Sequence, residues 1–224
     1  MSAIDFLFPR HCHICDAPLT QVESYVCSTC LARLPRTNYH RMPMNFMEQR
    51  FLGLVPFQRA AGHFFYSREG ELSTLIQDFK YRHFGGLARR MGRLMGEELI
   101  ITGFLSDIDL IVPVPMHWLK KGKRGYNQTE KIARGLSEAT GINMSLELKA
   151  VRGHRTQTSL SREQRLANTA GIFLAPHPER LHGRHILLLD DVCTTGATLS
   201  EAARALLNAV PDCRVSFLTL GVTF

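Results

Sequence analysis

The chain lacks the features that mark membrane-spanning, secreted or repetitive proteins. No apolar run in its 224 residues approaches the length of about 20 residues that spans a bilayer. It has no internal repeat and no low-complexity tract, which excludes a solenoid or a fibrous protein. With only six cysteines and no expected targeting segment, a secreted disulfide scaffold is excluded as well. We therefore expect a cytoplasmic protein, and an apolar share of 45% supports one α/β domain with a small appendage.

Four of the six cysteines form two closely spaced pairs near the N-terminus: Cys12-x2-Cys15 and Cys27-x2-Cys30. Four thiolates favour a closed tetrahedral Zn²⁺ site, which is structural because no coordination position is left for water. Such a short segment has little apolar core, so the metal would supply most of its folding free energy. Two disulfides or a redox CxxC pair are the competing interpretations. Neither suits a chain without a signal peptide or a thioredoxin-like pattern.

The most informative segment lies near the C-terminus and reads ILLLDDVCTTGAT over residues 186–198. Its first four residues are apolar without alternation, which predicts a short buried strand. Asp190 and Asp191 follow at the carboxyl end of that strand, where open α/β sheets bind ligands. A hydroxyl-rich turn comes next, before an amphipathic helix expected over 199–210, and a helix start of this kind suits a phosphate group. The two carboxylates suit ribose hydroxyls or a divalent cation.

This pattern resembles the 5-phosphoribosyl-1-diphosphate (PRPP) binding motif of the type I phosphoribosyltransferases. Together with the four-cysteine segment, nearly the whole chain resembles the ComF/ComFC (GntX-like) family. The resemblance implies an α/β fold, a type I phosphoribosyltransferase-like parallel sheet flanked by helices and preceded by a small zinc-binding module. We expect the zinc-binding module over 1–38, a linker that packs on the main domain over 39–60, and the phosphoribosyltransferase-like domain over 61–224.

The resemblance also implies a role for each residue of the motif. Asp190 and Asp191 are expected to hold the ribose hydroxyls and to act as catalytic residues. The 5′-phosphate is expected in the turn made by Thr194, Thr195, Gly196, Ala197 and Thr198. Val192 and Cys193 complete the PRPP-binding segment, and we expect Cys193 to be a packing residue rather than a nucleophile. Mg²⁺ is expected to accompany PRPP, bridging its oxygens partly through water.

Two further segments are expected to bind pyrophosphate. A β-rich run at 109–115 leads into a basic loop and a helix, and the expected site residues there are Pro115, Met116, Arg124 and Gln128. A polar segment at 152–173 resembles the loop that closes over PRPP, with Gln157 and the catalytic candidate Arg155. A solvated basic loop and a polar loop without a catalytic role are the alternatives. Lys80 belongs to a recurring family motif, but an ordinary surface role is equally compatible with its sequence.

The resemblance implies a protein that binds PRPP and Mg²⁺ and takes part in natural competence and DNA uptake. Transfer of phosphoribosyl to an unknown acceptor, with release of pyrophosphate, would make it an enzyme, but no general base is evident. The alternative is a non-enzymatic competence accessory that binds single-stranded DNA or protein partners and keeps the PRPP site as a sensor. A net charge of +7 is compatible with both. The sequence carries no signal for an oligomeric state.

Overall fold

The computed structural model describes residues 10–82, 84–116, 125–151 and 171–224. A five-stranded parallel sheet has the order β1-β7-β6-β2-β3. Its strands are β1 (Ala60–Phe65), β2 (Leu110–Pro113), β3 (Asn143–Met144), β6 (His185–Cys193) and β7 (Arg214–Val222). A separate antiparallel pair joins β4 (Lys149–Ala150) to β5 (Phe173–Leu174).

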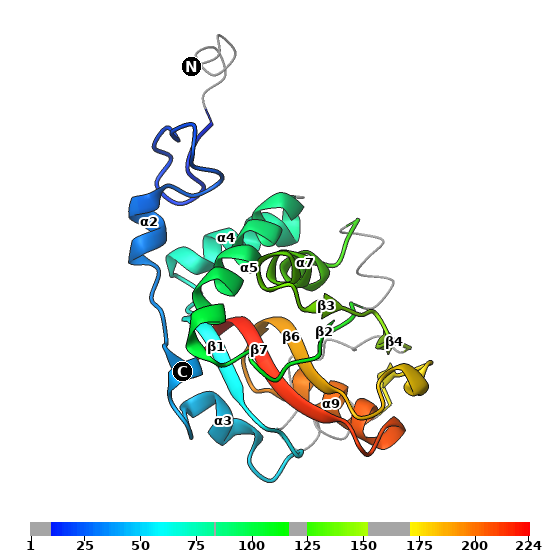
Figure 1. Cartoon of the computed structure of the whole chain (residues 1–224). Coiled ribbons are helices and arrows are strands. Elements are labelled where there is room, and N and C mark those ends of the chain that lie inside the picture. The colour runs from blue at the N-terminus through cyan, green and yellow to red at the C-terminus, as the bar shows by residue number, and fades with distance from the viewer. Residues whose placement is uncertain (1–9, 83, 117–124, 152–170) are drawn as a thin grey trace, which may run out of the picture.

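Helices cover both faces of the five-stranded sheet, with α5 and α7 on one face and α9 on the other (Figure 1). The helices are α2 (Ser28–Arg33), α3 (Phe46–Phe51), α4 (Glu71–Tyr81), α5 (Gly85–Leu99), α7 (Gln128–Thr140) and α9 (Ala197–Ala209). Short 3-10 turns are η1 (Tyr39–Arg41), η2 (Ile100–Thr102) and η3 (Pro178–Arg180). This arrangement confirms the parallel sheet flanked by helices that the sequence predicts.

The central strands are apolar because both of their faces are covered. Ile186, Leu187, Leu188 and Leu189 of β6 are fully buried. The strand is longer than expected, since it continues through both aspartates to Cys193. The reason is pairing: β7 stays in register beside it, with Asp190 opposite Thr219 and Cys193 opposite Val222. The carboxylates therefore sit on a hydrogen-bonded strand rather than in a loop.

Two glycines allow α5 and α7 to pack backbone to backbone beside the sheet. A Cβ on Gly92 of α5 would overlap the Ile132 carbonyl, and one on Gly135 of α7 would overlap the Arg89 carbonyl. At its start, α7 is capped by the Asn127 side chain, which accepts a hydrogen bond from the backbone N–H of Thr129. The amide of Asn127 also donates to the carbonyl of Val114, 3.1 Å away, and so joins the start of α7 to the end of β2.

The segment between the cysteines and the sheet contributes to the core. Within α3, Met47 and Phe51 are fully buried, and the side chain of Asn45 caps the helix. The Phe51 ring lies 4.2 Å from that of Phe217 in β7, measured between ring centroids. Residues 39–60 thus add a helix to the sheet domain. In the part of the chain that the structure describes, no helix is both long and apolar enough to cross a membrane.

Candidate functional site

The two aspartates of β6 lie at its carboxyl end, beside the first turn of α7. Asp191 accepts three contacts: the backbone N–H of Val192 at 2.7 Å, the amide of Gln128 at 3.0 Å and the ammonium of Lys80 at 2.6 Å. Lys80 comes from the last turn of α4. The structure therefore brings Gln128, a predicted site residue, and Lys80, whose role the sequence leaves open, to the same carboxylate.

Asp190 is partly buried and has other partners than Asp191 has. One of its oxygens accepts the backbone N–H of Asp191 at 2.8 Å and the hydroxyl of Thr129 at 3.4 Å. Burial, and then the charge of Asp191, raise the pKa of Asp190 to about 7. Because this pKa is close to neutral, one of the two adjacent carboxyl groups can accept or release a proton near pH 7.

The hydroxyl-rich turn follows the aspartates and leads into α9. Thr194 and Thr195 are exposed, and a small hollow is lined by the turn and by Asp190. Gly196 has a φ of +79°, a conformation that a residue with a Cβ adopts only at a cost. Because α9 begins at Ala197, its first backbone N–H groups lie at this turn. The turn can therefore hold an anion next to the carboxylate pair.

Two residues of α3 support the turn from behind. The Arg50 guanidinium donates to the backbone carbonyls of Thr194 and Thr223. Phe51 lies so close to Gly196 that a Cβ there would come within 2.9 Å of the phenyl ring. Sequence reasoning missed both residues, because they lie more than 140 positions before the turn. No local pattern in residues 39–60 distinguishes Arg50 from a surface arginine.

The structure describes some of the other predicted site residues and not the rest. Pro115 and Met116 are half-buried just beyond β2. Gln128 is buried, and its side-chain oxygen has no hydrogen-bond partner among the described residues. Arg124, Arg155 and Gln157 lie outside the described residues. Burial raises the pKa of the Cys193 thiol to about 11, so it is not a thiolate at neutral pH.

The four N-terminal cysteines form one cluster, with every sulfur within 4.8 Å of the others: Cys12, Cys15, Cys27 and Cys30. Cys15 and Cys27 have sulfurs 3.8 Å apart, which is the edge of a tetrahedron with zinc–sulfur bonds of about 2.3 Å. The sulfur of Cys12 accepts the backbone N–H of Cys27 at 3.3 Å. Burial by itself would raise the pKa of Cys12, but backbone donors lower it to about 6. These residues fit a structural zinc ion.

Comparison with known proteins agrees with both parts of the chain. The phosphoribosyl transferase domain family matches residues 103–220, slightly more than half of the chain. The double zinc ribbon domain family matches residues 3–41, which include all four clustered cysteines.

Three relatives extend the comparison over the length of the chain. The DNA utilization protein YhgH of Escherichia coli K12 is 30% identical over 214 residues, covering 89% of this chain and 92% of that protein. Competence protein F of Haemophilus influenzae is 34% identical over 140 residues, covering 60% of this chain and 61% of that protein. Competence protein ComFC of Bacillus subtilis 168 is 29% identical over 140 residues, covering 57% and 55%. The chain therefore spans less than two thirds of these two competence proteins.

The match to the Escherichia coli protein covers 89% of this chain, and the two matching domain families occur in the order that the structure shows. The chain belongs to the ComF family, in which a zinc ribbon precedes a phosphoribosyl transferase domain.

Proposed function

We propose that this protein binds PRPP together with Mg²⁺ at the carboxyl end of β6. The observation that carries the proposal is that an adjacent carboxylate pair, with Asp191 buried and Asp190 partly buried, is followed directly by a hydroxyl-rich turn at a helix start. Carboxylates accept hydrogen bonds from ribose hydroxyls, whereas the turn offers backbone N–H groups and hydroxyls to a phosphate. One ligand that needs both is a ribose 5-phosphate derivative.

In this proposal each part of the ligand meets its own group of residues. The 2′- and 3′-hydroxyls donate to Asp190 and Asp191, and the 5′-phosphate lies in the turn from Thr194 to Thr198. Pyrophosphate lies toward Pro115, Met116 and Gln128, with Mg²⁺ neutralising part of its charge. If an acceptor attacks the ribose C1, the bond to pyrophosphate breaks and pyrophosphate leaves. This transfer requires that the protein binds PRPP, whereas PRPP binding does not require the transfer.

Calorimetric titration of the full chain with PRPP and Mg²⁺ tests the proposal. The variant Asp190→Asn/Asp191→Asn should lose measurable binding, because amides carry no charge and turn two acceptors into donors. A suitable control is Asp212→Asn, an exposed carboxylate just before β7, at the opposite end of the strands from Asp190 and Asp191. Unchanged binding in the double variant would sink the ribose assignment, and no binding by the native chain would sink the proposed function.

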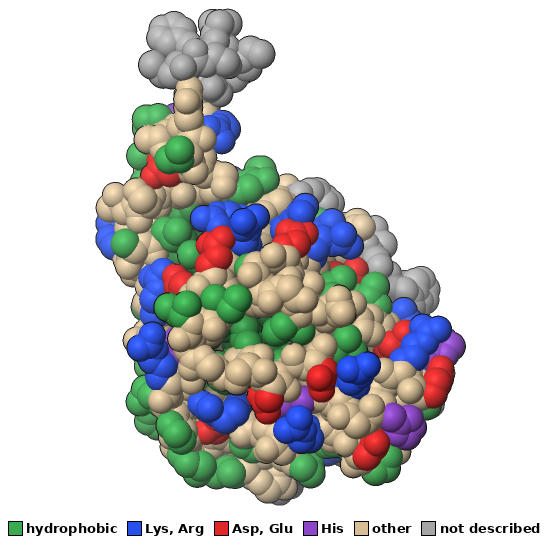
Figure 2. All heavy atoms as spheres, in the orientation of Figure 1, with side chains coloured by type: hydrophobic (Ala, Val, Ile, Leu, Met, Phe, Trp, Pro, Cys, Tyr) green, Lys and Arg blue, Asp and Glu red, His purple; other side chains and the backbone are tan. Residues whose placement is uncertain are grey.

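The names of the relatives support a role in competence or DNA use, with single-stranded DNA or competence proteins as candidate partners. The described surface gives direct DNA binding less support than PRPP binding. On α5, Arg89 is paired with Glu138, and Arg90 and Arg93 are both paired with Glu97. Figure 2 accordingly shows basic and acidic side chains mixed over this face. We therefore propose PRPP binding as the first function of the protein, and direct binding of DNA as the second candidate.

A further inference from the structure

The last turn of α4 reaches the carboxylate pair through one residue. Lys80 places its ammonium 2.6 Å from Asp191, and only 21% of its side chain is exposed. An ammonium at this position offsets carboxylate charge that would repel a diphosphate, and it has further N–H donors for phosphate oxygens. The position of Lys80 therefore bears on how tightly an anionic ligand binds.

The same turn of α4 is held from its other side by the zinc ribbon. His13, between the first two cysteines of the cluster, has its Nδ1 atom 2.5 Å from a carboxylate oxygen of Asp78. Both side chains are largely buried, at 15% and 5% exposure. Phe84 closes this contact, with its ring edge-on to His13 at 4.5 Å between centroids. This contact ties the ribbon to the helix, because the buried Asp78 carboxylate loses a hydrogen-bond donor without His13. The other oxygen of Asp78 is paired with Arg82 at 3.3 Å.

Helix geometry explains how one turn can serve both neighbours. Successive residues of an α-helix are about 100° apart, so positions two apart point in nearly opposite directions. Asp78 thus faces the ribbon while Lys80 faces Asp191. Between them, the carbonyl of Phe79 accepts a hydrogen bond from the hydroxyl of Tyr126, just before α7. The last turn of α4 is clamped between the ribbon and the candidate site.

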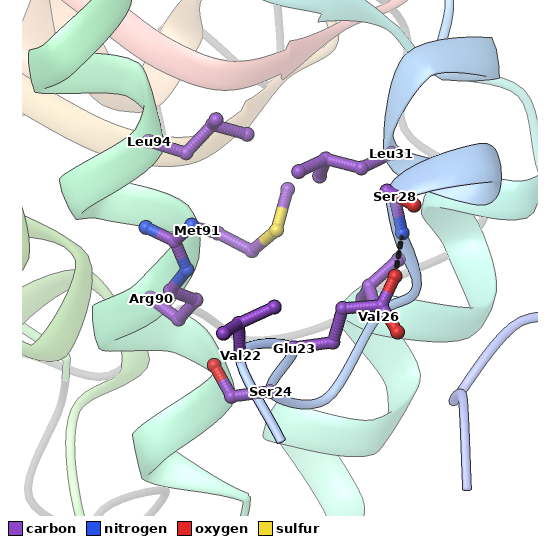
Figure 3. A pocket seen from close by; sticks show the side chains of 9 residues that line it. All are labelled: Val22, Glu23, Ser24, Val26, Ser28, Leu31, Arg90, Met91 and Leu94. Atoms are coloured by element: carbon purple, nitrogen blue, oxygen red, sulfur yellow. Dashed lines mark hydrogen bonds between the residues drawn. The ribbon is translucent and has the colours of Figure 1, made fainter. Parts of the chain in front are cut away.

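The ribbon also contacts α5, where Tyr25 lies against Gly86 so closely that a Cβ there would overlap its hydroxyl. A hollow lies between the ribbon and α5, lined on the ribbon side by Val22, Val26 and Leu31 and on the α5 side by Met91 and Leu94. Figure 3 shows these side chains around the open space. Of these ribbon contacts, the one between His13 and Asp78 is made to the same helical turn that carries Lys80.

We infer that the zinc ribbon positions Lys80 in the ligand site by holding the last turn of α4 through His13 and Asp78. The inference rests on the proposed function, because it concerns affinity for PRPP. His13 and Asp78 are positioning residues that never touch the ligand. Disruption of the ribbon should weaken PRPP binding only to the extent that Lys80 contributes to it.

A double-mutant cycle measures this coupling by calorimetry with PRPP and Mg²⁺. Asp78→Ala and Lys80→Met should each weaken binding about tenfold, the scale of one hydrogen bond to a charged group. The variant that carries both changes should bind like Lys80→Met alone. Asp78→Asn should restore most of the affinity, since its amide oxygen still accepts a hydrogen bond from His13. Arg33→Ala breaks a second ion pair between the ribbon and α4, with Glu71 in the first turn of α4, and should bind like the native chain.

Zinc content and melting temperature of every variant are measured alongside. If Asp78→Ala does not fold, zinc is removed from the native chain by a chelator instead. The zinc-free native chain should then bind PRPP about tenfold more weakly than the zinc-bound chain. Removal of zinc from Lys80→Met should not weaken its PRPP binding any further. The inference would be overturned if Asp78→Ala bound PRPP as tightly as the native chain. It would also be overturned if Asp78→Ala weakened PRPP binding equally in the native chain and in Lys80→Met. Failure of the native chain to bind PRPP would instead overturn the proposed function, so the two failures are distinguishable.

Discussion

At the scale of single residues, the site keeps an acidic pair in an environment that disfavours its full charge. Asp190 is next to Asp191, and burial together with that neighbour raises its pKa to about 7. Lys80 and Gln128 both contact Asp191 rather than Asp190. The pKa of Asp190 is therefore strongly shifted, and shifts of this kind are common in ligand-binding and catalytic sites.

Replacement of Asp190 by asparagine should stabilise the folded protein at high pH. The folded-state pKa of about 7 lies above the ordinary value of 3.8, so the folded protein binds this proton more tightly than the unfolded chain. That stabilisation is complete below about pH 4 and is lost as the pH rises through about 7. Asparagine does not titrate, so the free energy of unfolding of Asp190→Asn should gain on that of the native chain by more than about 1 kcal/mol between pH 4.5 and pH 8.

Denaturant unfolding at the two pH values checks this expectation. Asp212→Asn removes an exposed carboxylate and should show no comparable pH-dependent gain. A constant difference between Asp190→Asn and the native chain across this range would contradict the assigned pKa.

The sequence predicts much of the site at this scale because its central residues are contiguous. The aspartates and the turn from Thr194 to Gly196 lie within a few positions, so a local pattern reveals them. The contact between Lys80 and Asp191 joins positions more than 100 residues apart, and only the fold brings them together. Sequence reasoning could name Lys80 as a candidate without choosing its partner.

At the scale of secondary-structure elements, α3 is the support that the sequence did not reveal. Its Arg50 holds the carbonyls of Thr194 and Thr223, and its Phe51 fills the space beside Gly196. These contacts fix the backbone of the turn that leads into α9. The expected linker at 39–60 remains a prediction as a domain boundary, but its helix takes part in building the turn.

The variant Arg50→Met should weaken binding of PRPP and of ribose 5-phosphate about tenfold, because hydrogen bonds to a charged group are lost behind the turn. Arg50→Lys should recover only part of this affinity, since one ammonium does not reproduce the planar fork that spans two carbonyls. Calorimetry measures both ligands, and Arg68→Met serves as an exposed control on the loop before α4. Equal binding by Arg50→Met and the native chain would show that α3 has no part in the site.

The elements themselves are largely predictable, and their ends are less so. The apolar run at Ile186 to Leu189 predicts β6, and the periodic pattern that follows predicts α9. The strand continues to Cys193 because β7 pairs with it in register, which is a tertiary effect. Local pattern carries no information on that pairing.

At the scale of the whole molecule, α4 is one of the elements through which the zinc ribbon contacts the sheet domain. The four cysteines predict the ribbon because thiolate ligands occur at a recognisable spacing. The spacing does not predict where the ribbon lies, and its contact with Asp78 follows only from the three-dimensional arrangement. Figure 1 shows the cysteine segment beyond α2, at the side of the molecule away from α9.

Loss of one thiolate should release the metal without unfolding the sheet domain. Cys27→Ser removes one of four ligands, so metal analysis should show less than about a tenth of the native zinc content after dialysis. The sheet domain has its own core in β6, β7 and α9, so circular dichroism should retain its signal. Cys213→Ser changes a buried cysteine outside the cluster and should keep the zinc. Full zinc retention in Cys27→Ser would refute the four-thiolate site.

The central claim is that the carboxylate pair and the turn bind the two ends of one ribose phosphate. A crystal structure of the protein grown with PRPP and Mg²⁺ tests this most directly. We predict ribose hydroxyls within about 3 Å of the Asp190 and Asp191 carboxylates, and the 5′-phosphate at the backbone N–H groups from Thr195 to Thr198. A ligand bound elsewhere, or bound with its pyrophosphate rather than its 5′-phosphate in the turn, would contradict the account.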